Sequence, residues 1–130
     1  MNVLFICRHN RFRSKVGEAL LRKLAPELHV KSAGVEKDLP YVAPLVKKIV
    51  KEYGSEVGNT PRLVEDKMIR WADKIIVVAD NVDAKLFPKD KIEVWPIRDC
   101  DQDDEETIRL RVAEINKRVV DFIKRIKTRL

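Results

Sequence analysis

The chain has 130 residues, of which 45% are hydrophobic and 37% are charged, and its formal net charge is +6. This size and composition predict a single folded domain over residues 1–130 and exclude a disordered chain, and no apolar stretch approaches the length of a membrane span. The basic charge does not indicate nucleic-acid binding, because the Lys and Arg residues are scattered among acidic ones and neither a zinc-finger spacing nor an aromatic-rich strand accompanies them.

Apolar runs of strand length alternate with helical patterns through the first half of the chain. Residues 3–6 predict a strand that ends in a polar loop, and apolar positions between 16 and 24 predict the helix that follows. A weaker strand is predicted at residues 28–30, closed by the turn-like segment 32–34. A second helix is indicated by the apolar spacing from residue 42 to residue 50 and ends at Gly54.

The same alternation continues through the second half. Residues 61–71 predict a short helix that leads into a strand at 74–79, and residues 81–87 predict another short helix before a fourth strand at 92–95. The chain ends in one long amphipathic helix whose apolar stripe lies opposite Lys and Arg residues. The residues of this stripe are Ile108, Val112, Ile115, Val119, Phe122, Ile123 and Ile126.

Four apolar strands separated by helices predict an α/β fold. We expect a single three-layer domain, in which a four-stranded parallel sheet carries helices on both faces. Ligands of such folds bind at the carboxyl ends of the strands. The loop that starts at Cys7, the turn at Gly34, the segment after Ala79 and the loop after Trp95 should therefore meet at one edge of the sheet.

The loop after the first strand combines a cysteine, five further residues, an arginine and a serine. Backbone N–H groups in a loop between a strand and a helix can point inward and hold an anion, and the helix N-terminus adds positive potential. Arg13 can bind two oxygens of a tetrahedral dianion through its planar guanidinium. The residues predicted to bind phosphate are Arg8, His9, Asn10, Arg11, Phe12, Arg13 and Ser14.

Cys7 lies at the floor of this predicted loop, where the same field favours the thiolate over the thiol. A thiolate below a bound phosphate is a nucleophile directed at phosphorus. The Ser14 hydroxyl can donate a hydrogen bond to the sulfur, and Asn10 tolerates the left-handed backbone conformation that a tight loop requires. A cysteine at the end of a buried strand can equally be a small core residue. The order of strand, loop and helix favours the catalytic interpretation.

Residues 3–19 resemble the phosphate loop of the low-molecular-weight protein tyrosine phosphatases, whose superfamily includes the thioredoxin-coupled arsenate reductases. The resemblance extends to the segments 32–34, 72–76 and 95–99. It therefore covers nearly the whole chain, with the elements in the same order.

The resemblance implies a cysteine-dependent phosphomonoester hydrolase, a protein tyrosine phosphatase that acts through a phosphocysteine intermediate. It implies that Cys7 is the nucleophile, that Arg13 binds the phosphate and that Ser14 stabilises the thiolate. Asn10 matches a loop asparagine of the family, and Ser32 matches a serine that hydrogen-bonds to it.

A phosphatase of this kind also needs an acid that protonates the leaving oxygen. The family uses an aspartate after its fourth strand, usually followed by proline; here the matching pair is Asp99-Cys100. Asp101 is an alternative acid, and the acidic run around both residues also suits a solvated helix N-terminus. A calcium-loop interpretation of this run fails, because Asp104 occupies the glycine position and Leu110 the final glutamate position. No metal or cofactor is expected.

Two other functions remain open at this stage. An arsenate reductase could use the same loop, but it needs resolving cysteines, which the family places after the third strand, where residues 79–82 contain none. Phe12 also replaces a second loop cysteine found in many relatives. Cys100 is the only candidate redox partner, and we hypothesise that it forms a disulfide with oxidised Cys7. The third option is a non-catalytic phosphate-binding module.

The expected partner is a phosphorylated substrate, a phosphotyrosine protein or a small aryl phosphate. Tyr41 is a candidate aromatic wall for it, although a tyrosine next to Pro40 also suits simple loop packing. We expect no nucleic acid and no membrane as partners, and a monomer or a weak dimer. Met1 leads directly into a strand-like segment without the basic flank of a signal peptide, which predicts a cytoplasmic location.

Overall fold

The computed structural model describes residues 1–128 and contains one sheet of four parallel strands. The strands are β1 (Asn2–Cys7), β2 (His29–Gly34), β3 (Lys74–Val78) and β4 (Ile92–Trp95), and their spatial order is β2-β1-β3-β4. The chain passes from β1 to β2 on one side and then to β3 on the other, so the strand order reverses at β1. In open α/β sheets the crevice at such a point receives the ligand. The loop after β1 starts at this crevice.

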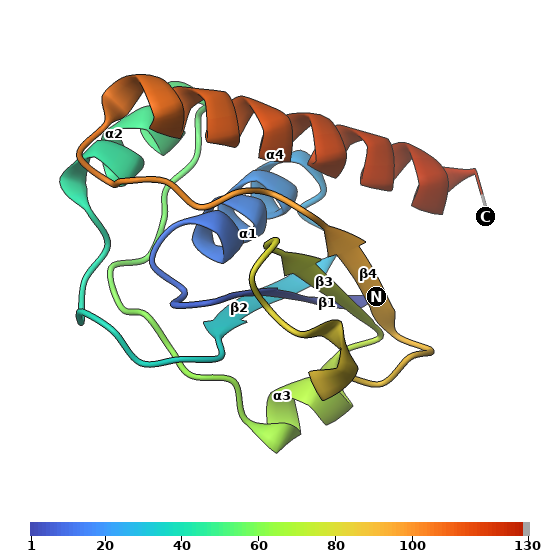
Figure 1. Ribbon diagram of the computed structural model, residues 1–130. Helices are drawn as coiled ribbons and strands as arrows, with labels where there is room; N and C mark the ends of the chain where they lie inside the picture. The colour runs from blue at the N-terminus through green and yellow to red at the C-terminus, as the bar shows by residue number, and fades with distance from the viewer. Residues whose placement is uncertain (129–130) are drawn as a thin grey trace.

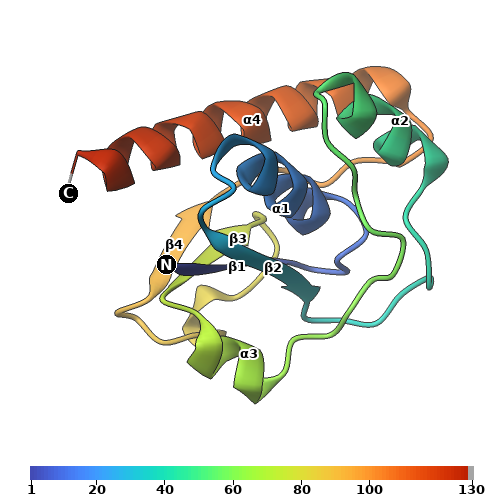
Figure 2. The same cartoon turned by 180° about the vertical axis from the view of Figure 1, so that it is seen from behind.

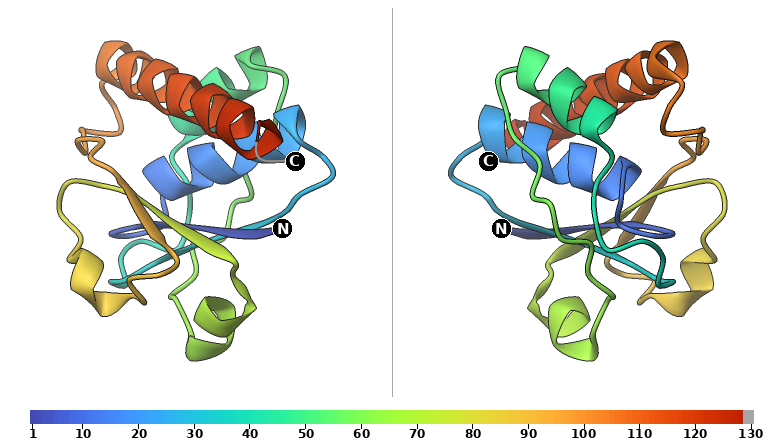
Figure 3. Two further views of the ribbon diagram at one scale, coloured as in Figure 1. Left: turned by 90° about the vertical axis from the view of Figure 1, so that its right-hand side faces the viewer. Right: turned by 90° about the vertical axis from the view of Figure 1, so that its left-hand side faces the viewer.

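Helices cover both faces of the sheet (Figures 1 and 3). On one face lie α1 (Arg13–Leu24), α2 (Pro44–Glu52) and α4 (Glu105–Lys127), and on the other lie α3 (Asp66–Trp71) and the short 3₁₀ helix η1 (Ala84–Leu86). The predicted α/β fold with a parallel four-stranded sheet is confirmed. No helix within residues 1–128 has the length and apolar character needed to cross a membrane. The predicted domain runs to residue 130, and its last two residues lie outside the described residues.

The central strand β1 is buried on both faces, which explains its unbroken apolar sequence. Val3 and Phe5 belong to the core cluster formed with α1, α2 and α4, whereas Leu4 and Ile6 belong to the cluster formed with α3. All four side chains are fully buried. Successive side chains of a strand point to opposite faces, so β1 takes part in both clusters. This packing holds the strand that ends in Cys7.

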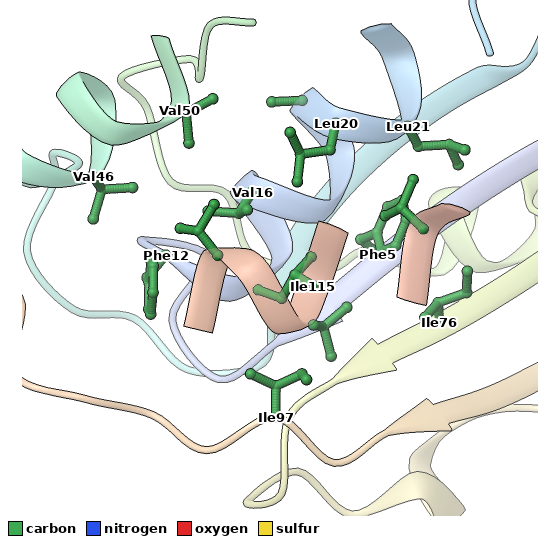
Figure 4. Packing of buried hydrophobic residues seen from close by; sticks show 14 of the residues in the cluster. Phe5, Phe12, Val16, Leu20, Leu21, Val46, Val50, Ile76, Ile97 and Ile115 are labelled. Carbon is green, nitrogen blue, oxygen red and sulfur yellow. The ribbon is translucent and has the colours of Figure 1, made fainter. Parts of the chain in front are cut away.

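The larger cluster reaches from the sheet to the loop after β1 (Figure 4). Phe12, from that loop, and Val16, from α1, are both buried members of this cluster. Trp95 of β4 packs edge-to-face against Phe5 and Phe122, with ring centroids 5.6 and 6.3 Å apart. The start of α1 is therefore fixed by apolar contacts to the sheet and to α4.

The helix predicted at residues 61–71 is wrong over its first half, because α3 begins only at Asp66. The Gly34 N–H donates to the carbonyl of Arg62, and the Val64 N–H donates to the carbonyl of Gly34, both at 2.8 Å. This pairing holds residues 61–65 in an extended conformation against the end of β2. The predicted turn at 32–34 is instead part of β2, because these residues continue the parallel pairing with residues 5–7 of β1. A tertiary contact here overrides local propensity.

The helix predicted at residues 81–87 is reduced to the single turn of η1. The Asp83 carboxylate accepts a hydrogen bond from the Lys85 N–H (2.9 Å), which caps this turn. Pro88 disfavours a helical conformation at Phe87, so the turn does not continue. The other predicted helices and strands are confirmed, with small shifts at their ends.

Candidate active site

The loop between β1 and α1 is a tight turn that begins at Cys7 and ends at Arg13. Asn10 has a φ of 55°, the left-handed conformation predicted for it. Gly34 lies directly against this loop: a Cβ at Gly34 would be 2.7 Å from the His9 carbonyl carbon and 2.8 Å from the Asn10 nitrogen. Only glycine allows β2 to approach the loop backbone this closely.

Cys7 is buried at the floor of the loop, with 2% of its surface exposed. Its Sγ lies 2.9 Å from the Ser14 Oγ and accepts a hydrogen bond from the Asn10 N–H at 3.3 Å. Within residues 1–128 no side chain caps the start of α1, so the first N–H groups of that helix remain available to an anion. The sulfur therefore lies among donors, as a thiolate requires.

The Asn10 side chain sets the direction of the hydrogen bond to the sulfur. Its Oδ1 accepts from the Arg62 N–H (2.9 Å), which can only donate, so the amide orientation is fixed. Its Nδ2 then donates to the Ser14 Oγ (2.7 Å) and to the Ser32 Oγ (2.9 Å). Because the Ser14 oxygen accepts from Asn10, its own hydrogen is free to donate to Cys7. The predicted contact between Asn10 and Ser32 is confirmed.

This network continues to a carboxylate that the sequence analysis did not single out. The Ser32 hydroxyl donates to Glu18 Oε1 at 2.7 Å. Glu18 belongs to α1, and its other oxygen pairs with Arg22 one turn later (2.9 Å). No local pattern marks Glu18 as part of the site, because an acidic residue in a helix ordinarily faces solvent.

Arg13 is almost fully buried, with 2% of its side chain exposed. Its guanidinium donates to the Ile97 carbonyl (2.9 Å) and to Asn81 Oδ1 (3.0 Å). It also pairs with Asp99 (3.4 Å) and Asp80 (3.5 Å). The segments after β3 and β4 were predicted to lie at this edge, and Asp99 was predicted there as the acid, but Asp80, Asn81 and the Ile97 carbonyl were not identified as partners of Arg13. Their positions directly after strands were the available signal.

One small pocket, with an empty volume of about 180 Å³, lies above Cys7. Asp99 lines this pocket, and Asp101 does not; instead Asp101 is exposed, and the neighbouring carboxyl group of Asp103 raises its pKa. The residues that line the pocket are Cys7, His9, Arg11, Phe12, Arg13, Asp99 and Gln102. Gln102 was not predicted, since it lies beyond the matched segments. The geometry favours Asp99 over Asp101 as the group that can reach a bound phosphate.

Three basic side chains of the loop, those of Arg8, His9 and Arg11, are directed at the segment 36–41. Arg8 Nε donates to Glu36 (3.1 Å), and His9 Nε2 lies 3.4 Å from the other oxygen of Glu36. The hydrogen bond from Arg8 makes the largest contribution to lowering the pKa of Glu36, and the one with His9 lowers it further. Arg11 Nε donates to the Tyr41 carbonyl (2.8 Å), and its guanidinium lies 5.2 Å from the centre of the Tyr41 ring. Of these three side chains, those of His9 and Arg11 also line the pocket.

Cys100 is half-buried and packs against the larger core cluster, whereas Cys7 belongs to the other one. Burial, followed by the nearby charge of Asp99, raises the pKa of the Cys100 thiol to about 11. Little thiolate forms there near neutral pH. The pairing of Cys100 with Cys7 therefore stays a hypothesis.

The arrangement can bind a tetrahedral oxyanion and attack it. Backbone donors, the start of α1 and a buried guanidinium supply positive potential, and the sulfur supplies an electron pair. Among residues 1–128, no group of three or more His, Cys, Asp or Glu side chains is arranged to hold a metal ion.

A family profile described as low molecular weight phosphotyrosine protein phosphatase matches residues 2–129 of the chain. An arsenate reductase from Archaeoglobus fulgidus is 35% identical, with a TM-score of 0.83 over 94% of this chain and 98% of the other. The arginine phosphatase YwlE from Geobacillus stearothermophilus is 25% identical, with a TM-score of 0.83 over 98% of this chain and 94% of the other.

A low molecular weight protein tyrosine phosphatase from T. tengcongensis shares the fold, with 20% identity and a TM-score of 0.85 over 96% of this chain and 99% of the other. The curated proteins contain no match to the chain.

Proposed function

The chain belongs to the low molecular weight phosphotyrosine protein phosphatase family, and from this premise we propose that it hydrolyses phosphomonoesters through a phosphocysteine on Cys7. One observation carries the proposal: the Cys7 sulfur accepts from the Asn10 N–H (3.3 Å), lies 2.9 Å from the Ser14 hydroxyl and lines a pocket with the buried Arg13. These are the contacts that a nucleophilic thiolate and a bound phosphate need.

In the first step the substrate phosphate binds to the N–H groups of the loop and to Arg13. The Cys7 sulfur attacks phosphorus in line, the bond from phosphorus to the leaving oxygen breaks, and Asp99 gives a proton to that oxygen. Asp99 suits this role because its carboxyl group lines the same pocket as Cys7 and Arg13, within reach of a leaving group on a bound phosphate.

In the second step water attacks the phosphocysteine. Asp99, now a carboxylate, takes the proton of the water, and the sulfur leaves with the electron pair as a thiolate. Ser14 stabilises that thiolate with its hydroxyl hydrogen, because its oxygen already accepts from Asn10.

For the substrate, we favour phosphotyrosine proteins or small aryl phosphates in the cytoplasm. Tyr41 supports this choice, because Arg11 holds it beside the loop through its carbonyl and its ring. Tyr41 is 45% exposed, so its ring is free to contact an aromatic leaving group.

Arsenate reduction is the second candidate, favoured by the 35% identity to the reductase from Archaeoglobus fulgidus. Arsenate has the shape and charge of phosphate and suits the same loop. The sequence holds only one other cysteine, Cys100, and burial raises the pKa of that thiol. The hydrolase remains the better-supported function.

The test compares the chain with its Cys7→Ser and Cys100→Ser variants on para-nitrophenyl phosphate and on arsenate with a thiol reductant. The proposal predicts that hydrolysis is lost only in Cys7→Ser, and that acid quenching traps one phosphoryl group on Cys7, detected by mass spectrometry. Cys100→Ser is the matched control, since it removes the other thiol. Arsenite formation that requires both cysteines, without phosphate hydrolysis, would assign the reductase instead.

A further inference from the structure

Two hollows follow one another along the surface beside the catalytic pocket. The first lies between the segment 36–40 and the segment 61–63, and it shares His9 with the catalytic pocket. The second reaches Trp71 of α3 and shares Arg62 with the first. Figure 2 shows the chain that leads into α3 passing the end of β2 on this side of the molecule. Together the hollows form a groove that starts at the phosphate site, the flanking groove.

The acidic side chains near the start of this groove already have partners. Glu36 accepts from Arg8 and lies within 3.4 Å of His9. Asp38 lies 3.7 Å from His9 and 3.4 Å from Arg11. These carboxylates are neutralised by the phosphate loop itself, so they leave little negative charge for a ligand.

Three cations of the flanking groove have no acidic partner within residues 1–128: Lys31, Lys37 and Arg62. All three residues are exposed. The Lys31 ammonium lies 4.5 Å from the centre of the Trp71 ring, which holds it in the second hollow. The uncompensated charge of the groove is therefore positive, in agreement with the net charge of +6.

The groove also offers apolar contact area. Leu39 and Leu63 line the first hollow and are 47% and 46% exposed. Exposed aliphatic side chains beside unpaired cations suit an extended polypeptide that carries both acidic and aliphatic residues.

We propose that the flanking groove binds the acidic polypeptide segment next to the phosphorylated residue of a protein substrate. The inference rests on the proposed function and adds the chemistry of the substrate around its phosphate. The phosphoryl group enters the pocket above Cys7, and acidic side chains next to it pair with Lys37 and Lys31 along the groove.

The experiment measures binding and needs no turnover. Fluorescence anisotropy measures the binding of two labelled peptides to the Cys7→Ser chain. In the acidic peptide the phosphotyrosine is flanked by Glu and Leu, and in the basic peptide it is flanked by Lys and Leu. The groove variant adds Lys31→Glu and Lys37→Glu. The control variant adds Lys124→Glu and Lys127→Glu in the last turn of α4, where Figure 1 shows the helix ending far from the phosphate loop.

We expect the acidic peptide to bind more tightly than the basic one, and the groove variant to lose about tenfold in affinity for it. The control variant, with the same change in net charge, keeps its affinity within about twofold. Added salt should weaken the binding of the acidic peptide to the Cys7→Ser chain more than its binding to the groove variant.

Equal binding of the two peptides, or an equal loss in both variants, would overturn the proposal, because the effect would then be absent or due to net charge alone. Hydrolysis of para-nitrophenyl phosphate by the Lys31→Glu, Lys37→Glu chain with Cys7 intact separates the two inferences. Unchanged hydrolysis together with weaker peptide binding supports both the hydrolase function and the peptide-binding role of the groove. Selective binding of the acidic peptide by a chain that hydrolyses no substrate supports the role of the groove and rejects the hydrolase function.

Discussion

Asn10 shows how one residue connects the sequence pattern to the chemistry. Its backbone takes the left-handed turn, its N–H donates to Cys7, and its amide directs the hydrogen of Ser14 toward the same sulfur. The amide performs this last role only because the Arg62 N–H fixes its orientation. A residue next to the nucleophile thus depends on a backbone group 52 positions away.

Asp99 is a second single residue on which the chemistry depends, because it is the candidate acid that lines the pocket above Cys7. We predict that Asp99→Ala lowers kcat about 100-fold on phenyl phosphate and less on para-nitrophenyl phosphate, because the poorer leaving group depends more on protonation. Steady-state kinetics with both substrates check this.

Asp101→Ala is the matched control for this comparison and should stay within about twofold of the parent chain, since Asp101 is exposed and does not line the pocket above Cys7. The opposite order of effects would reassign the acid to Asp101.

Among the elements, the end of β2 and the segment 61–65 support the phosphate loop. Gly34 packs against the loop backbone and also pairs with Arg62 and Val64. The loop is thus held from behind by two segments distant in sequence. Its shape depends on their packing as well as on its own residues.

Gly34→Ala tests this support. The added Cβ would lie 2.7 Å from the His9 carbonyl carbon, so the backbone must shift. We expect a loss of about 2 kcal/mol in the free energy of unfolding, measured in urea, and weaker inhibition by inorganic phosphate.

Gly58→Ala provides the control, because its Cβ would meet only the Lys15 ammonium at an ordinary 3.7 Å. This variant should keep its phosphate affinity and gain a few tenths of a kcal/mol, since alanine restricts the unfolded chain. Equal phosphate affinity in both variants would contradict the supporting role of Gly34.

At the scale of the whole molecule, Glu93 connects β4 to the last helix. Its carboxylate accepts from Arg125 of α4 and from the Trp95 indole (2.7 Å), and only 17% of its side chain is exposed. Burial by itself would raise its pKa, but the hydrogen bonds from Arg125 and Trp95 lower it to about 2. The sequence pattern marked Glu93 only as a residue within a strand.

This lowered pKa links stability to pH. A carboxyl group whose pKa falls on folding stabilises the fold above its unfolded pKa of about 4.5, and this contribution is lost as the pH falls toward 2. We predict that Glu93→Gln lowers the free energy of unfolding by about 2 kcal/mol at pH 7, and that the difference shrinks below pH 4.

Urea unfolding at several pH values measures this difference. Glu65→Gln is the control, because Glu65 forms an exposed pair with Lys67 (3.5 Å) and should change stability little at any pH. A Glu93→Gln effect that is the same at pH 7 and pH 3 would contradict the proposed linkage.

The elements of the fold were predictable where local pattern and tertiary burial agree. β1 and α4 follow directly from an unbroken apolar run and a helical stripe. Residues 61–65 were predicted wrongly, because their pairing with Gly34 depends on a neighbour that local propensity does not contain. The helix predicted at residues 81–87 was too long, because a short apolar pattern does not determine how many helical turns form; only the single turn of η1 is present.

The residues of the phosphate loop could be read from the chain alone, because they are consecutive and their chemistry follows from the strand before them and the helix after them. The contacts of Ser14 with Cys7 and of Asn10 with Ser32 were also predicted, but the other partners of the site came only from the folded chain. Arg13 meets Asn81 and the Ile97 carbonyl, and Ser32 meets Glu18, through contacts whose geometry depends on how the strands and helices pack. Packing sets distances to within an ångström, and hydrogen bonds require that accuracy, whereas a pattern of residue types specifies only which segments lie at the same edge.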